Sequence, residues 1–293
     1  MPRMAPVLAG LILLSATACG RSATNSSSGR VKVIASFYPL AEAATRVGGD
    51  RVDVRNLTPP GVEPHDLELN TGEVAAIQDA ALVLVMGRGF QPAVEKAAAG
   101  RSGTAEVLTR LPVTDTATEN DPHVWLDPVL MSSIVDQVVD AMARADTGSA
   151  DGYHSRGAAF KKELSDLDSR YRDGLSSCAR REIVTSHEAF GWLARRYGLT
   201  QEGVLGLSPE QEPDPGRLAA LVDFVKQHGV TVVFTESLVS PKVAETLARE
   251  AGVRTEVLDP LEGLSDDQVR GGDNYVSVMD ENLRKLREAL GCR

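Results

Sequence analysis

The sequence predicts an α/β protein of two lobes, each with a mostly parallel sheet, joined by a single long helix. Three observations support this fold class. Short apolar runs alternate with helical stretches over residues 31–150, and the same alternation returns over residues 178–293. Between these lobes, residues 151–177 show the apolar spacing of one continuous helix, which we expect to link them.

The first lobe is expected to contain four strands and the helices that connect them. The expected strands are residues 31–37, 52–57, 81–86 and 105–108, and the expected helices are residues 39–47, 71–80, 91–99 and 128–145. Residues 81–86 are apolar almost throughout, which is typical of a central parallel strand covered on both faces.

The second lobe repeats the pattern. Its expected strands are residues 182–186, 202–205, 230–235 and 254–258, and its expected helices are residues 189–197, 215–228, 241–251 and 266–290. In the linking segment, apolar residues recur at spacings of four, three, four and four, at Phe160, Leu164, Leu167, Tyr171 and Leu175. They form one face of a helix of about 25 residues, or roughly 37 Å.

Composition and motifs exclude some functions. The chain has 293 residues, enough for two domains, and a formal net charge of -10, which argues against a nucleic-acid partner. No Gly-x-x-x-x-Gly-Lys-Ser/Thr segment occurs, so the chain does not bind ATP through a P-loop.

Residues 1–18 are expected to be a signal peptide. Arg3 precedes an apolar stretch over residues 7–14, which is too short to cross a bilayer as a mature helix. Small residues then lead to Cys19, as in a bacterial lipoprotein cleavage site where the cysteine becomes an acylated N-terminus. An ordinary secretory signal with an incidental cysteine is the alternative. Residues 20–30 are rich in Ser, Gly, Asn and Thr and are expected to form a flexible tether.

Two further cysteines, Cys178 and Cys292, would then face an oxidising environment. They could form a disulfide that closes a loop of about 114 residues. Two free buried thiols are the alternative. Neither cysteine lies near a histidine motif, so we do not expect them to bind metal.

Three histidines lie where ligands bind in open α/β sheets. His65, His123 and His187 each occupy a loop after an expected strand or before an expected helix, and they come from both lobes. A solvated or structural turn histidine is the alternative at each position. Three imidazoles meeting between the lobes would suit zinc or another borderline divalent metal. The residues after His187 do not form His-Glu-x-x-His, so that type of metalloprotease is not supported.

A fourth ligand should be an oxygen from the second lobe, a water molecule, or absent. Asp259 at the end of the last expected strand is the best protein candidate. Glu63 and Glu236 are candidates for carboxylates that accept a hydrogen bond from an imidazole N–H and orient it. Because metal binding requires neutral imidazoles, affinity should fall as pH drops through roughly 6.5.

The chain also resembles a known family, the zinc/manganese-type metal-binding lipoproteins of bacterial ABC importers. The resemblance covers nearly the whole mature chain and rests on residues 36–40, 60–66, 121–128, 186–190, 212–215 and 258–261. It implies two (β/α)4-type lobes joined by one long helix, with a metal ion buried between them. By motif position it implies His65, His123, His187 and Asp259 as metal ligands.

The third ligand position bears on which metal is bound. Manganese-type members have glutamate where this chain has His187, so the resemblance implies Zn2+, with Mn2+ still possible. Zinc-type members often carry a histidine-rich acidic loop before the second ligand. The corresponding residues 112–122 are acidic but contain no histidine.

The expected function is capture of Zn2+ outside the membrane and delivery to a permease driven by a separate ATPase. The protein would be a monomer, anchored through Cys19 to the outer face of the cytoplasmic membrane. It would not be an enzyme. The alternatives are a Mn2+-specific capture protein, a surface adhesin on the same fold, and a three-histidine zinc hydrolase or lyase with an open fourth position. Coordination by Asp259 would argue against catalysis.

Overall fold

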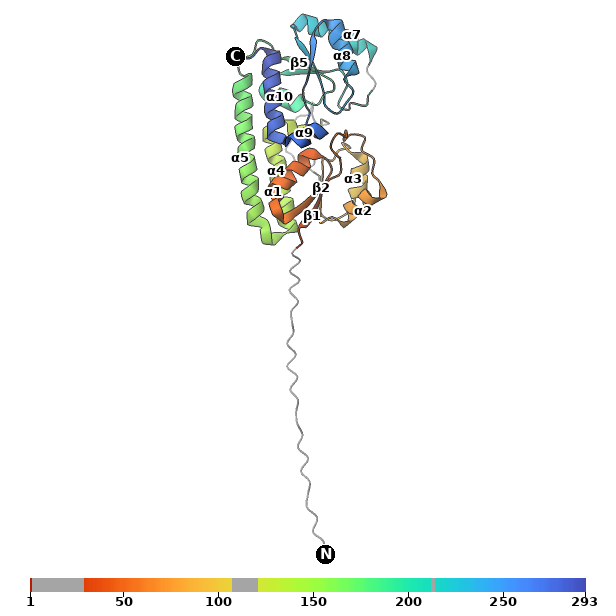
Figure 1. Cartoon of the computed structure of the whole chain (residues 1–293), viewed down its shortest axis with the longest axis vertical. Helices are drawn as coiled ribbons and strands as arrows, with labels where there is room; N and C mark the ends of the chain where they lie inside the picture. The colour runs from red at the N-terminus through yellow and green to blue at the C-terminus, as the bar shows by residue number, and fades with distance from the viewer. Residues whose placement is uncertain (2–28, 107–120, 212–213) are drawn as a thin grey trace.

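The computed structural model describes residue 1 and residues 29–106, 121–211 and 214–293 (Figure 1). Residues 2–18 of the expected signal peptide, Cys19, the tether up to residue 28 and the acidic loop up to residue 120 lie outside these residues. Two lobes stand one above the other beside a long helix (Figure 1). Each lobe contains a four-stranded parallel sheet, so the predicted fold class is confirmed.

The sheet of the N-terminal lobe has the strand order β2-β1-β3-β4. Its strands are β1 Val31–Ala35, β2 Val52–Asn56, β3 Leu82–Val85 and β4 Thr104–Glu106. The helices of this lobe are α1 Tyr38–Gly48, α2 Thr71–Asp79, α3 Pro92–Ala98 and α4 Pro128–Ala145. All pairings are parallel, and Val33 pairs with Val54 on one side and Leu82 on the other. The first strand is therefore central.

The sheet of the C-terminal lobe has the equivalent order, β6-β5-β7-β8. Its strands are β5 Glu182–Thr185, β6 Thr200–Gly203, β7 Val232–Thr235 and β8 Arg254–Val257. Its first helices are α6 Gly191–Tyr197, α7 Pro215–His228 and α8 Lys242–Ala251. The chain leaves β5 toward β6 and later returns to the other side of β5 at β7. This change of direction creates a crevice at the carboxyl ends of β5 and β7, where such sheets bind ligands.

The last segment differs from the single helix expected over residues 266–290. The structure has two helices there, α9 Asp266–Gly271 and α10 Tyr275–Leu290. Gly272 ends α9 in a left-handed conformation with φ 77°, which glycine adopts without steric cost. The Asn274 side chain then accepts hydrogen bonds from the backbone N–H groups of Val276 and Ser277 and begins α10. The single-helix prediction was wrong because it ignored these two signals.

The linking helix is α5, Ala150–Leu175, and it packs against both lobes (Figure 1). A Cβ at Gly157 would lie 2.4 Å from the Val139 side chain, so glycine allows α5 to approach α4 closely. At its other end, the Tyr171 hydroxyl donates to the Met279 carbonyl of α10 at 2.7 Å. The helix is therefore held along its length.

One hydrophobic core is shared by the two lobes. It contains large buried residues from the N-terminal lobe, from α5 and from the C-terminal lobe, among them Phe37, Trp125, Phe160, Tyr171, Phe190 and Tyr275. Each sheet also has one smaller hydrophobic cluster on its outer side. Over the part of the chain that the structure describes, no helix is both long and apolar enough to cross a membrane.

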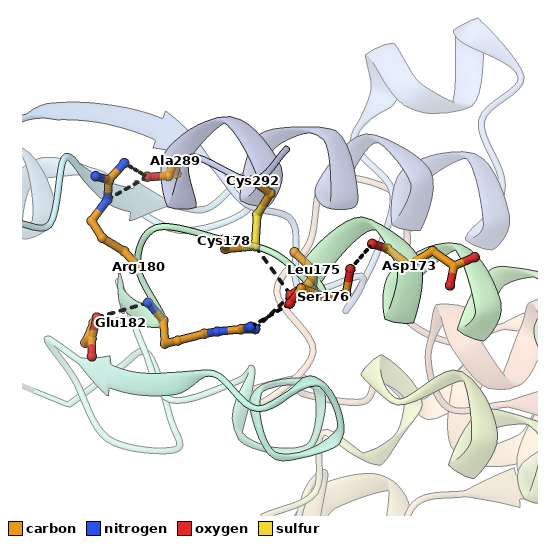
Figure 2. The surroundings of a disulfide bond; sticks show 9 residues. Asp173, Leu175, Ser176, Cys178, Arg180, Glu182, Ala289 and Cys292 are labelled. Carbon is orange, nitrogen blue, oxygen red and sulfur yellow. Dashed lines mark hydrogen bonds between the residues drawn. A yellow bond between two sulfur atoms is a disulfide. The ribbon is translucent and has the colours of Figure 1, made fainter.

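The two cysteines form a disulfide, the first of the two outcomes that the sequence left open. Cys178 follows the end of α5 and Cys292 follows the end of α10, so the bond joins the ends of two neighbouring helices (Figure 2). Arg180 donates from Nη2 to the Ala289 carbonyl at 2.9 Å and reinforces the same junction (Figure 2). The C-terminal lobe is thereby closed on itself over 114 residues.

Removing this disulfide should destabilise the protein because the unfolded chain gains freedom across a long loop. We expect the Cys178→Ser/Cys292→Ser variant to lose about 2–5 kcal/mol of unfolding free energy, measured by urea unfolding without metal. A reductant should lower the stability of the wild type to a similar extent and leave the double variant unchanged. Equal unfolding midpoints for the oxidised wild type and the double variant would contradict the prediction.

Candidate metal centre

His65 lies in a stiff loop between β2 and α2. Proline at positions 59, 60 and 64 limits the backbone conformations of this loop. The Gln91 side chain donates to the Pro64 carbonyl at 3.2 Å. The backbone N–H of His65 donates to Glu63 Oε2 at 2.9 Å. The loop therefore presents the imidazole from a fixed backbone.

His123 repeats this arrangement in the segment Asp121-Pro122-His123. Its backbone N–H donates to Asp121 Oδ1 at 2.9 Å, as His65 does to Glu63. The same oxygen lies 2.7 Å from His123 Nδ1, so Asp121 also orients the ring. A 3-10 turn, Val124–Leu126, and the helix α4 follow directly, with Asp127 as the N-cap of α4. An acid–proline–histidine segment thus presents each histidine of the N-terminal lobe.

His187 follows β5 at the crevice of the C-terminal sheet. Glu236 follows the neighbouring strand β7 and holds His187 at two points, with Oε1 3.0 Å from the backbone nitrogen and Oε2 2.7 Å from Nδ1. A proton on Nδ1 satisfies this contact and leaves the Nε2 lone pair for a ligand. Asp121 has the same effect on His123.

The three imidazoles meet at one carboxylate oxygen, Oε1 of Glu262. This oxygen lies 3.2 Å from His65 Nε2, 3.1 Å from His123 Nε2 and 3.2 Å from His187 Nε2. The Nε2 atoms of His123 and His187 are themselves 3.3 Å apart. One ligand atom from each of the four residues lies within 4.8 Å of the other three.

This geometry fits zinc. Four ligand atoms at about 2.0–2.1 Å from a zinc ion form a tetrahedron with edges of about 3.3–3.4 Å. Four of the six distances among the ligand atoms are 3.1–3.3 Å, close to that length, and all six are within 4.8 Å. Three imidazole nitrogens and one carboxylate oxygen are also ligand types that zinc prefers.

Asp259, the expected fourth ligand, does not join the cluster. Its Oδ1 accepts from the backbone N–H of Leu261 at 2.8 Å. Its Oδ2 accepts from Gln268 Nε2 at 2.7 Å and from the Ser237 hydroxyl at 3.1 Å. Both oxygens are thus engaged by other groups, and Glu262, three residues later, supplies the carboxylate instead.

The orienting carboxylates also differ in part from the expectation. Glu236 contacts the imidazole of His187 as expected, whereas Glu63 accepts from the backbone of His65 and its Oε1 lies 4.0 Å from Nε2. Asp121 was missed, although its place two residues before His123 matches that of Glu63 before His65. Glu262 was missed because nothing in its neighbourhood distinguishes it from Asp259 in sequence.

The carboxylates and imidazoles change one another's pKa values. Burial alone would raise the pKa of Glu262, but the surrounding imidazoles outweigh burial and hold the pKa well below its ordinary value. Burial would lower the pKa of His187, yet Glu236 and Glu262 outweigh it and raise that pKa well above its ordinary value. The pKa of His123 is raised against burial by Asp121 and Glu262. In the metal-free cluster the buried carboxylates and imidazoles therefore stabilise one another's charged forms.

The cluster is almost closed to solvent. The side chains of His123 and His187 are 0% exposed and that of Glu262 is 1% exposed. His65 is 9% exposed and is the only one of the four with appreciable contact with solvent. Aromatic rings cover the N-terminal side, with Phe90 4.7 Å from the His65 ring and Trp125 5.2 Å from the His123 ring. An ion held here would be shielded from water.

The fold consists of two α/β lobes with parallel sheets, joined by a long helix, and a buried nitrogen-rich ligand set lies between the lobes. These features define the class of metal-binding solute-binding proteins. The family described as zinc-uptake complex component A, periplasmic, matches residues 33–289, and the chain belongs to this family.

Among relatives, the high-affinity zinc uptake system protein ZnuA of Bacillus subtilis is 35% identical, over 97% of this chain and 96% of that protein. The zinc-binding lipoprotein AdcA of Streptococcus pneumoniae is 33% identical over 98% of this chain but only 61% of its own length. The chain therefore spans about three-fifths of that relative.

Solved structures of zinc-binding and metal-transporting proteins are also similar to this chain. The Zn(II)-bound ZnuA-like domain of Streptococcus pneumoniae AdcA has a TM-score of 0.77 at 34% identity, covering 89% of this chain and 99% of that one. The laminin-binding protein of Streptococcus agalactiae, described as bifunctional with adhesin and metal-transporting activity, has a TM-score of 0.81 at 33% identity with the same coverage.

Loss of the carboxylate that orients His123 should weaken metal binding. We expect Asp121→Asn to reduce zinc affinity by about 10–100-fold, because the amide no longer fixes the Nδ1 proton or raises ligand basicity. A competition titration against a zinc chelator measures the change. Asp136→Asn on the exposed side of α4 removes a carboxylate that pairs with Lys161, and it should leave affinity unchanged. Equal affinity of Asp121→Asn and Asp136→Asn would disprove the orienting role.

Zinc binding should strengthen as pH rises through and above neutrality. Their raised pKa values mean that His123 and His187 keep their protons to higher pH than ordinary imidazoles in the metal-free protein, and zinc must displace these protons. Zinc affinity therefore reaches its full value only above these raised pKa values and falls as the pH drops below them. The pH range of this fall lies above the 6.5 expected from an ordinary histidine. Calorimetric titrations in two buffers of different ionisation enthalpy count the protons released. Zero proton release at pH 7 would refute this.

Proposed function

We propose that the protein captures Zn2+ outside the cytoplasmic membrane and delivers it to the permease of an ABC importer, whose ATPase is a separate chain. The observation that carries this proposal is the buried cluster of His65, His123, His187 and Glu262 between the two lobes, whose ligand atoms all lie within 4.8 Å of one another. Relatives named for zinc uptake and zinc binding support it. In this proposal the zinc ion is cargo and not a resident cofactor.

A hydrolase or lyase is not supported by this ligand set. Catalytic zinc sites keep a fourth position for water or substrate, whereas four protein ligands are typical of closed sites. Here Glu262 occupies the fourth position and is buried with His123 and His187. We therefore propose that the protein is not an enzyme.

The ligand types favour Zn2+ over Mn2+. Manganese prefers oxygen ligands in an octahedral arrangement, whereas zinc accepts nitrogen-rich tetrahedral sites. The cluster offers three nitrogens and one oxygen, and the Glu262 Oε1 atom lies 3.1–3.2 Å from each of the three nitrogens. His187 contributes directly to this preference because it supplies a nitrogen at the third position.

Two features support the proposed location of the protein. The disulfide between Cys178 and Cys292 fits an oxidising compartment. The N-terminal sequence fits export, with Cys19 as a lipid anchor and residues 20–30 as a tether to the fold. We propose a monomer on the outer face of the cytoplasmic membrane. Within the described ranges, no feature favours the adhesin alternative over metal capture.

Release of the ion requires work on the lobe interface. Side-chain hydrogen bonds cross between the lobes, among them those from Trp125 to Pro260, from Trp192 to Asp121, from Arg196 to Asp127 and from Tyr275 to Trp125. Asp121 also orients His123, so the interface and the metal cluster share a residue. Contact with a permease that strains this interface would weaken the hold on His123. Delivery would thereby be confined to the docked complex.

Metal titration tests the proposed function directly. The purified mature protein should bind one Zn2+ and much less Mn2+. Glu262→Gln should weaken zinc binding by more than the roughly 10–100-fold cost of losing an orienting partner, because it removes a ligand. His187→Glu should shift the preference toward Mn2+, since it replaces a nitrogen by an oxygen.

The matched control is His154→Glu, which makes the same change at an exposed position on α5. It should bind zinc like the wild type. The proposal of zinc capture fails if the wild type binds no Zn2+, or binds Mn2+ as tightly as Zn2+. The site assignment fails if Glu262→Gln, His187→Glu and His154→Glu all bind alike.

A further inference from the structure

Asp259 is almost fully buried at 5% exposure, and its backbone and side chain are both engaged. Its backbone N–H donates to Asn282 Oδ1 at 2.9 Å, and its carbonyl accepts from Asn282 Nδ2 at 2.7 Å. Asn282 is itself 1% exposed and belongs to α10. A two-point clamp therefore fixes the backbone of Asp259 to a long helix.

The side chain of Asp259 extends this clamp toward the metal cluster. Its Oδ1 accepts from the backbone N–H of Leu261, the residue directly before Glu262. Leu261 has φ 55°, in the left-handed region that leucine rarely adopts. Such a conformation is sterically unfavourable and persists only where the surrounding structure imposes it. The Asp259 carboxylate supplies part of that constraint.

The N-terminal lobe holds the same loop from the other side. The Pro260 carbonyl accepts from Trp125 Nε1 at 2.8 Å, and the Leu264 carbonyl accepts from the Gly61 N–H at 2.9 Å. Glu262 lies between these two contacts in sequence. The loop is thus fixed at both ends, and its strained turn directs Glu262 toward the three imidazoles.

We infer that Asp259 and Asn282 are positioning residues that hold the Glu262 loop in its ligating geometry and act on the metal only through Glu262. This inference rests on the proposed capture of zinc at the cluster. Partners that orient a metal ligand are typically worth about 10–100-fold in affinity, and we expect that magnitude for either residue. Asp259 thereby serves the site without contacting the ion.

Two other effects could link Asp259 to metal affinity. Its negative charge could attract the ion directly through space, and its hydrogen bonds could simply stabilise the C-terminal lobe. Asn282 separates charge from position because it is neutral and holds only the backbone of Asp259. A double-mutant cycle separates both effects from positioning, because residues that act through one ligand lose their effect once that ligand is gone.

The experiment measures zinc affinity by chelator competition for Asp259→Asn and Asn282→Ala, each in the wild-type and in the Glu262→Gln background. Each substitution should weaken binding about 10–100-fold in the wild-type background and by less than about twofold in the Glu262→Gln background. Asp266→Asn, a nearby exposed aspartate in the first turn of α9, is the matched control and should have no effect in either background.

Two further readouts distinguish positioning from general support. The absorption spectrum of bound Co2+ should change in Asp259→Asn and Asn282→Ala toward that of Glu262→Gln, because all three lose the carboxylate ligand. Thermal unfolding without metal shows whether each variant is folded. Ser237→Ala, which removes a single hydroxyl from Asp259 Oδ2, should change affinity in the same direction by less and carries the test if a larger change prevents folding.

The outcomes are distinct. Equal losses in both backgrounds, or unchanged affinity in the wild-type background for folded variants, would overturn the positioning roles. Loss for Asp259→Asn alone, with Asn282→Ala unchanged, would show direct attraction by charge and overturn them as well. Failure of the unaltered protein to bind zinc would instead reject the proposed function.

Discussion

Burial of the Glu262 carboxylate at the junction of the two lobes constrains everything around it. Taking a carboxylate out of water costs several kcal/mol unless opposite charges or hydrogen-bond donors surround it. Its partners here are three Nε2 atoms within 3.2 Å, carried by loops of both lobes. The carboxylate is therefore compensated only when the lobes are docked and all three loops are in place.

The rest of the fold supplies that docking. His65 follows β2 in one lobe and His187 follows β5 in the other, so each parallel sheet presents a ligand loop after the carboxyl end of a strand. The shared core and α5 then keep the lobes at a fixed separation. Asp121 and Glu236 complete the centre, because each fixes one imidazole and also supplies negative charge.

Sequence alone predicts most of the fold and three of the four cluster residues. The strands and α5 are predictable because hydrophobic periodicity depends on local geometry. The histidines are predictable because each follows a strand or precedes a helix in a restrained loop. Which of Asp259 and Glu262 supplies the carboxylate ligand is not predictable in this way. It depends on Leu261, whose φ of 55° turns the chain so that Glu262, and not Asp259, faces the cluster. That turn is set by contacts with Asn282 and Trp125, which are distant in sequence.

The contacts that compensate the buried Glu262 carboxylate also determine which movements can open the metal site. A rigid swing of one lobe would expose a core that runs through both of them, so it would cost much more than a movement of the ligand loops. His65 has the largest exposure of the four cluster residues, and its loop is bonded to the Glu262 loop through Gly61 and Leu264. Displacing either loop breaks that backbone contact and disturbs the other. A partner that engages the His65 loop would therefore loosen two ligands of the cluster at once while the shared core stays closed.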